Sequence, residues 1–137
     1  MSTAILVILL LYFWAVVYCG TKFELSTENW ENKPILKEVV PMGVKRVAAF
    51  LKKSYPKEVS KENPKLKKVL KIENEKADQV AGTNFWLELL LVAGSQVFKC
   101  SRVVVRLPFP SDCNQKGSLC LEYLSDSGAY EHQCSLA

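Results

Sequence analysis

Positions 41–55 carry apolar residues at the spacing of an α-helix. The apolar residues that share one face are Val44, Val47, Ala48, Leu51 and Tyr55. One side of this helix is therefore predicted to pack against a core. Pro41 suits the first helical turn, where a backbone N–H is not needed, and Pro56 is expected to end the helix near Tyr55.

Strand-like segments follow the helix. They span positions 66–76, 83–92, 97–107 and, more briefly, 118–124. In the second of these, every other residue is apolar, which places Phe85, Leu87, Leu89 and Leu91 on one face. In the third, Arg102 and Arg106 alternate with apolar residues and are expected to face water. One helix followed by consecutive strands predicts an α+β domain in which an antiparallel meander wraps the helix.

The two ends of the chain have a different character. Residues 4–19 carry no charge and are too few to span a bilayer comfortably, so a cleaved signal peptide is predicted for 1–19, with a signal anchor as the alternative. The remaining residues, 20–137, are enough for one compact domain and too few for two separate cores. Residues 21–37 should form an extended arm, and 125–137 a polar tail that includes His132.

Four cysteines remain once the predicted leader and its Cys19 are removed: Cys100, Cys113, Cys120 and Cys134. An even number in the last third of a secreted chain predicts two disulfides, for which three pairings exist. No Cys-x-x-Cys spacing occurs and His132 is the only histidine, so we expect no metal site and no other cofactor. Paired cysteines and a lone imidazole also argue against nucleophilic catalysis, so an enzyme is not expected.

The net charge of +4 is unevenly distributed. Residues 45–76 contain 11 lysines and arginines and 4 glutamates, which gives +7. A solvated basic face is the simplest interpretation, and attraction to anionic surfaces is the alternative. Nucleic acid is not an expected partner, because the lysines are not interleaved with aromatic residues that could stack on bases.

Three segments resemble type 2 cystatins, and short invertebrate-like members in particular. Gly43-Val44-Lys45-Arg46, with Phe50 and Tyr55, resembles the long helix of that family. Asp78-Gln79-Val80-Ala81-Gly82 resembles its first hairpin, Gln-x-Val-x-Gly, and the run from Cys100 to Leu107-Pro108-Phe109 resembles the strand that leads into its second, Pro-Trp hairpin. The resemblance covers about residues 30–124. It implies a cystatin-like fold, with one long helix wrapped by a four- to five-stranded antiparallel sheet.

The resemblance also implies a function. Cystatins are secreted, reversible inhibitors that block the cleft of papain-like cysteine proteases, such as cathepsins L and B, with an N-terminal arm and two hairpin tips. The residues carried over to protease binding are Asp78, Gln79, Val80, Ala81, Gly82, Leu107, Pro108 and Phe109. We expect a monomer without a membrane segment after signal cleavage. A non-inhibitory binding protein on the same scaffold, which uses the basic face, is the alternative.

This chain departs from the family pattern at three places. Asp78 stands at the first position of the first-tip motif, unless Gln79 takes that role, and Phe109 stands in place of tryptophan. The arm segment 31–35 contains no glycine. The resemblance further implies disulfides between Cys100 and Cys120 and between Cys113 and Cys134, with a sequential pairing along the chain as the alternative.

Overall fold

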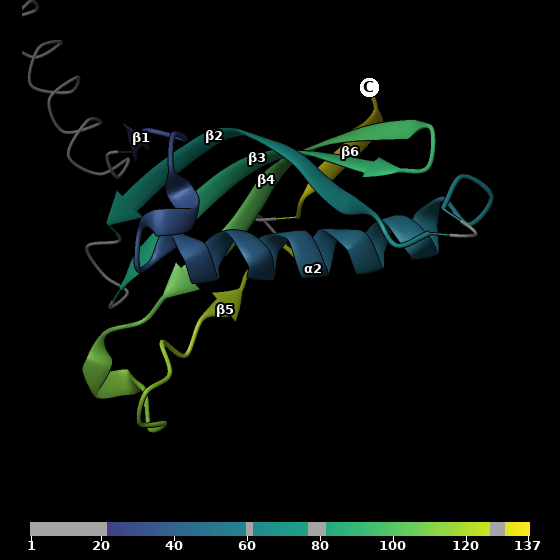
Figure 1. Ribbon diagram of the computed structural model, residues 1–137. Helices are drawn as coiled ribbons and strands as arrows, with labels where there is room; N and C mark the ends of the chain where they lie inside the picture. The colour runs from purple at the N-terminus through teal and green to yellow at the C-terminus, as the bar shows by residue number, and fades with distance from the viewer. Residues whose placement is uncertain (1–21, 60–61, 77–81, 127–130) are drawn as a thin grey trace, which may run out of the picture.

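The structure is a computed structural model that describes residues 22–59, 62–76, 82–126 and 131–137. One long helix lies against an antiparallel sheet, which confirms the predicted α+β class, and the described residues form six strands (Figure 1). The predicted signal peptide lies outside the described residues. The elements are β1 (Lys22–Leu25), η1 (Trp30–Asn32), α2 (Leu36–Ser54), β2 (Lys65–Lys76), β3 (Thr83–Ala93), β4 (Gln96–Leu107), η2 (Pro110–Asp112), β5 (Glu122–Tyr123) and β6 (Gln133–Leu136).

The helix α2 begins five residues earlier than predicted and contains Pro41 in its interior. Leu36, Val39 and Val40 are buried and continue the apolar face of the helix toward its N-terminus. Burial of these three side chains favours the extra turn, and it offsets the backbone hydrogen bond that a proline cannot donate. The helix ends at Ser54, close to the position expected from Pro56.

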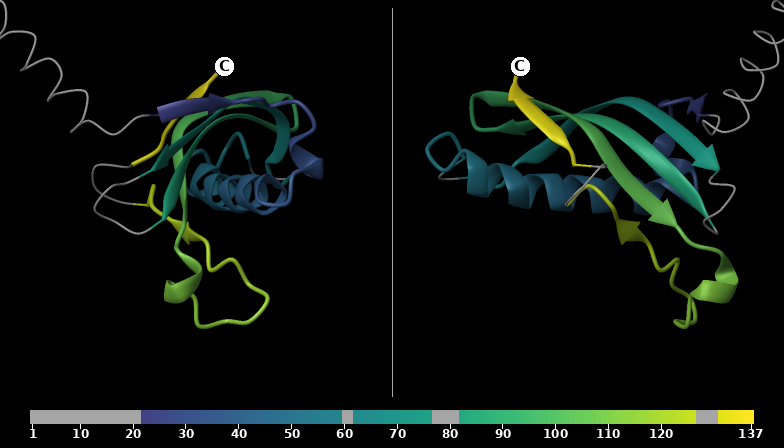
Figure 2. Two further views of the ribbon diagram at one scale, coloured as in Figure 1. Left: turned by 90° about the vertical axis from the view of Figure 1, so that its left-hand side faces the viewer. Right: turned by 180° about the vertical axis from the view of Figure 1, so that it is seen from behind.

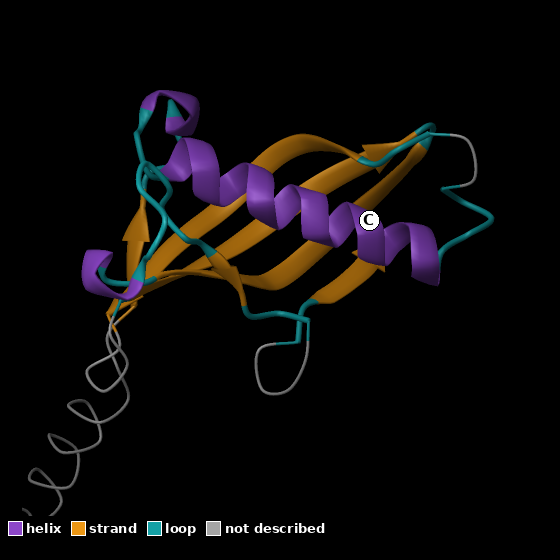
Figure 3. Ribbon diagram, turned by 90° about the horizontal axis from the view of Figure 1, so that it is seen from below, coloured by secondary structure: helices purple, strands orange, loops and turns teal. Residues whose placement is uncertain are grey.

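The core lies between α2 and the inner face of the sheet, across which the helix runs obliquely (Figure 3). Leu87, Leu89 and Leu91 of β3 are buried there, as their alternation predicted, and Phe85 is buried beside them. Gly43 of α2 meets this face so closely that a Cβ atom would lie 3.0 Å from the Cδ1 atom of Leu87. The absence of a side chain at Gly43 therefore lets the helix approach the sheet.

The strands are ordered β1-β2-β3-β4-β5, and β6 pairs with a second stretch of β4. The sheet curls around the helix, which is plain when the molecule is seen along the helix axis (Figure 2). Register shifts interrupt β2 opposite β3, at Leu66/Lys68 and Val69/Lys71, and interrupt β3 opposite β4 at Leu87/Leu89. Such bulges bend strands and increase their twist, which suits a sheet wrapped around a helix.

Ser125 bridges the place where β4 changes partner. β4 pairs with β5 at Val105 and Arg106, and with β6 from Phe98 to Ser101. Between these stretches Arg102 has a φ of 58°, and the fully buried Ser125 hydroxyl donates to its carbonyl at 2.7 Å and accepts from the Val104 N–H at 2.7 Å. A side chain thus satisfies backbone groups that neither strand reaches.

The disulfide pairing implied by the resemblance is wrong. Cys100 is bonded to Cys134, not to Cys120, and Cys113 is bonded to Cys120, not to Cys134. The physical reason is strand β6, which the polar tail did not reveal: its register places Cys134 directly opposite Cys100, with their Cα atoms 4.1 Å apart. A disulfide does tie the C-terminal tail, as expected, but its partner is different.

His132 is also placed differently from the prediction of a solvated tail. Its side chain is 8% exposed, and its ring meets Phe50 of α2 edge-on with 4.2 Å between the ring centroids. The Nδ1 atom lies 2.9 Å from the carbonyl oxygen of Ser125 and 3.1 Å from the Tyr123 hydroxyl. His132 therefore belongs to the contacts that fasten the chain between β5 and β6 onto the helix.

Candidate functional site

The described residues of the two tips predicted from the sequence lie at one end of the sheet, where β3 begins and β4 ends. Asp78, Gln79, Val80 and Ala81 fall outside the described residues, so the described part of the first tip is Gly82. The neighbouring Thr83 pairs with Leu107 at the end of β4. We refer to Gly82 and the segment Leu107–Phe109 as the tip end.

Gly82 packs directly against the second tip. It has a φ of 127°, a conformation that L side chains rarely adopt. A Cβ atom at this position would overlap the carbonyl oxygen of Leu107 and lie 3.1 Å from the Cα atom of Pro108. The glycine is therefore required by the contact between the two tips, whatever else approaches it from outside.

Phe109, which follows the residues that Gly82 contacts, is exposed to solvent. Pro108 before it is buried, and Pro110 after it opens the short helix η2. The side chain of Phe109 is nevertheless 54% exposed and does not belong to the hydrophobic core. Two prolines restrict the backbone on either side of an exposed aromatic ring, so the ring sits on a stiff loop.

Strand β1 reaches the same end of the sheet. It pairs with the last part of β2, with Lys22 opposite Glu75 and Phe23 opposite Asn74. Phe23 is 58% exposed, and the Nζ atom of Lys22 lies 3.6 Å from the centroid of the Trp86 ring. Phe23 carried no signal in the sequence analysis, because a single apolar residue in an unpatterned arm does not reveal its exposure.

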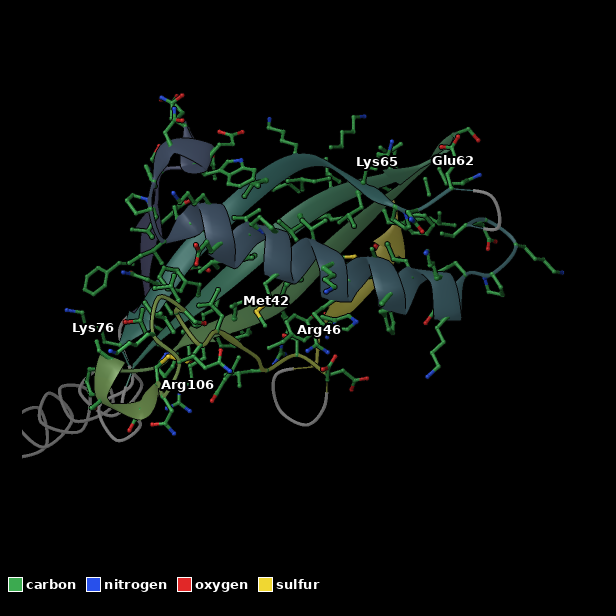
Figure 4. The ribbon with its side chains drawn as sticks, turned by 60° about the horizontal axis from the view of Figure 1, so that its bottom comes forward. Met42, Arg46, Glu62, Lys65, Lys76 and Arg106 are labelled. Atoms are coloured by element: carbon green, nitrogen blue, oxygen red, sulfur yellow. A yellow bond between two sulfur atoms is a disulfide. The ribbon has the colours of Figure 1, made fainter. Side chains whose placement is uncertain are left out.

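Two ion pairs lie on β4, one near the tip end and one farther along the strand. An Arg106 Nη1 atom lies 3.6 Å from a carboxylate oxygen of Glu122, across the β4–β5 pair. On the outer face of the sheet, Lys99 contacts Glu88 at 3.1 Å. Figure 4 shows Arg106 beside the green η2 segment, with Lys76 at the same end of the molecule. Arg106 and Lys99 thus each have a carboxylate partner on a neighbouring strand.

Titration and metal chemistry add no further site. Tyr123 has a pKa well above its ordinary value, chiefly because the phenol is buried, with the Asp126 carboxylate adding to the effect. Within 22–59, 62–76, 82–126 and 131–137, histidine, cysteine and carboxylate side chains form no group of three or more that could hold a metal ion. Across the same ranges, no helix has both the length and the apolar character needed to cross a bilayer.

Comparison of the chain with protein-family models, with curated proteins and with solved structures found no match. The candidate site is therefore described from the geometry of this chain alone. Of the eight residues predicted to form it, Gly82, Leu107, Pro108 and Phe109 lie together at one end of the sheet. The other four are outside the described residues and stay predictions.

Proposed function

We propose that the chain is an extracellular, cystatin-like inhibitor of papain-like cysteine proteases. In this proposal the tip end and the N-terminal arm fill the protease cleft and exclude substrate, without covalent chemistry. The observation that carries the proposal is the contact of Gly82, the last residue of the first predicted tip, with Leu107 and Pro108 of the second, beside the exposed Phe109. Two disulfides support an extracellular location.

Phe109 is proposed as the main apolar anchor. Aromatic side chains that enter a pocket carry a large share of the binding energy at protein interfaces, commonly about 2 kcal/mol or more on truncation. The stiff loop set by Pro108 and Pro110 reduces the entropy lost when the ring becomes fixed. An exposed phenylalanine that the fold does not use is free to serve a partner.

Strand β1 is proposed as the third contact, in place of the segment 31–35. Residues Trp30–Asn32 form η1, and the Lys37 N–H donates to the carbonyl of Lys33, so this segment leads into α2. Phe23 instead carries exposed apolar area at the end of the sheet that the tips share.

Three contacts on one edge of a small domain suit the size of such an interface. Protease–inhibitor complexes bury about 1,600 Å² in total, or about 800 Å² on each partner. Two hairpin tips and a strand end can supply this area without any movement of the core. We therefore propose that the inhibitor acts as a monomer.

Titration of active papain and of a cathepsin L-type enzyme with the disulfide-bonded protein tests this function. Reversible inhibition at submicromolar concentration is expected, together with binding to papain whose nucleophile carries a small blocking group, because occlusion does not use the thiolate. No inhibition of either enzyme at micromolar concentration would contradict the proposal. That outcome would favour the alternative, a non-inhibitory binding protein that uses its basic residues.

A further inference from the structure

The end of the molecule opposite the tip end carries exposed lysines. They belong to the last turn of α2, the connector that follows it and the beginning of β2. These six residues are Lys52, Lys53, Lys57, Lys65, Lys67 and Lys68, all exposed, and we call them the lysine end. In Figure 1 the C-terminus of α2 and the start of β2 lie at the right, and the end of β4 lies at the left.

The basic segment predicted from the sequence is therefore not one face. Lys65 and Lys76 stand at opposite ends of β2, as Figure 4 shows, and eleven strand steps separate them by roughly 35 Å. Arg46, in the middle of α2, lies 3.5 Å from Asp126, and Lys71 lies 3.7 Å from Glu73. What gathers at one place is the lysine end alone.

The lysine end lacks the counter-charges that the rest of the molecule supplies. Within the described ranges, the ion pairs use Arg46, Lys71, Lys99 and Arg106, and none uses any of the six lysines. The exposed carboxylates described in the same stretch are those of Glu58 and Glu62. Six positive charges with two negative ones leave an excess that attracts polyanions.

Structural roles account for some of these lysines. Lys52 and Lys53 suit the C-terminal turn of a helix, where the helix dipole is negative. Lys67 and Lys68 lie on a part of β2 that β1 does not cover, because β1 pairs only with Ile72–Glu75, and lysine on a sheet edge discourages unwanted strand pairing. Neither role requires the two groups to meet at one end without carboxylate partners.

We propose that the lysine end binds a sulfated polysaccharide. Lysine is a compact point charge that suits sulfate groups on a flexible polymer, whereas planar, bidentate recognition would favour arginine, and the described residues 52–59 and 62–68 contain none. Base stacking is not available, since the nearby Tyr55 ring packs on Phe98 at 5.1 Å. The exposed large apolar residues, which a membrane surface would engage, lie outside this stretch.

The two ends can then act at the same time. Because the lysine end and the tip end lie at opposite ends of the helix and the sheet, a polysaccharide bound at one leaves the other accessible. This binding does not depend on protease inhibition and stands or falls separately from it.

Calorimetric titration with a heparin decasaccharide at physiological ionic strength tests the proposal. The variant Lys65→Gln/Lys67→Gln/Lys68→Gln is compared with Lys37→Gln/Lys45→Gln/Lys116→Gln, which removes the same charge from exposed positions elsewhere. The first variant should bind at least about tenfold more weakly, and the second within about twofold of the natural protein. The dependence of log K on log salt should lose about two to three units of slope in the first variant only.

A second variant, Lys52→Gln/Lys53→Gln/Lys57→Gln, removes the helix side of the lysine end and leaves β2 untouched. It should weaken binding by a similar factor, so the result does not depend on one strand tolerating its substitutions. Equal weakening by the Lys37/Lys45/Lys116 control would show a response to net charge only and would overturn the proposal. So would an absence of binding at micromolar concentration, or binding to phosphatidylserine vesicles without binding to the decasaccharide.

Discussion

The tip end and the lysine end differ in what holds their exposed groups in place. At the tip end, Phe109 is fixed by a buried proline, and Gly82 packs against the backbone of Leu107 and Pro108. At the lysine end, six long side chains extend into water without ion-pair partners in the described residues. The first arrangement is an apolar side chain on a restricted loop, and the second is a group of exposed charged side chains.

In the two proposals above, one small core carries two kinds of binding surface. A fixed apolar ring suits a shaped pocket, because little conformational entropy remains to be lost on binding. Unpaired lysines suit a long anion without a fixed shape, because attraction over several ångströms needs no exact fit. The sheet and α2 serve both ends as a common frame.

Removal of a disulfide is expected to have the largest effect on the free energy of unfolding. Cys100–Cys134 closes a sequence separation of 34 inside the core, and Cys113–Cys120 closes one of 7 beside the tip end. Chain entropy predicts a loss of roughly 4 kcal/mol for Cys100→Ala/Cys134→Ala and roughly 2 kcal/mol for Cys113→Ala/Cys120→Ala. Urea unfolding of the two variants measures both values.

The same two variants also distinguish binding at the tip end from binding at the lysine end. The Cys113/Cys120 variant should inhibit papain more weakly even under conditions where it stays folded, because this disulfide closes the loop that follows Phe109. It should bind the decasaccharide with unchanged affinity. A larger stability loss for this variant than for the Cys100/Cys134 variant would contradict the core position of Cys100.

Substitution of alanine for one glycine at each end of the molecule is expected to have the next largest effect on stability. Gly82 and Gly94 both have positive φ, 127° and 60°, but a Cβ atom at Gly94 would meet nothing within 4 Å. Gly94→Ala should cost about 1 kcal/mol for the left-handed conformation. Gly82→Ala should cost about 3 kcal/mol, because strain and overlap with Leu107 act together.

Thermal unfolding of the two glycine variants measures this difference, which should lower Tm by about 10 °C more for Gly82→Ala than for Gly94→Ala. Equal decreases would mean that the tips do not touch and that Gly82 is free to serve only a partner.

A smaller effect, confined to alkaline pH, is expected at Tyr123, which lies between the two ends. Burial raises the pKa of its phenol above the ordinary value of about 10, so the folded state favours the neutral form. The associated stability is fully present below pH 10 and is lost as pH rises further. Tyr123→Phe should remove this alkaline loss, which stability measurements across pH 8 to 11 would detect; an unchanged profile would contradict the burial.

The sequence predicted the helix and the middle strands, because their patterns are local, and it predicted two disulfides from the even number of cysteines. The face of β3 with Leu87, Leu89 and Leu91 is one such pattern. Strand β6 was missed, since the four residues Gln133–Leu136 are too few for their alternation to stand out in a polar tail, and the strand is held by its register with β4 and by the Cys134 disulfide. Long-range register of this kind leaves no local signal, so the cysteine partners were predicted wrongly.

At the candidate site, the sequence predicted that Gly82 and Phe109 would each contact a protease. It could not reveal that Gly82 is needed for the contact with Leu107 and Pro108. That requirement arises from the approach of Leu107, which lies 25 residues later along the chain. His132 was likewise misplaced, because its burial depends on Phe50 and Ser125 from other segments. Such environments are created by packing and cannot be predicted from one residue and its neighbours.

The proposed inhibition depends on exposed apolar area at the tip end and not on apolar area elsewhere. Phe109 and Leu136 are similarly exposed, at 54% and 49%, and Leu136 lies in β6, away from the tips. The most direct measurement is the papain inhibition constant of Phe109→Ala beside that of Leu136→Ala. We predict that Phe109→Ala raises the constant by about 30-fold, corresponding to about 2 kcal/mol, with its Tm nearly unchanged, while Leu136→Ala leaves inhibition intact. Equal constants for the two variants would contradict the account.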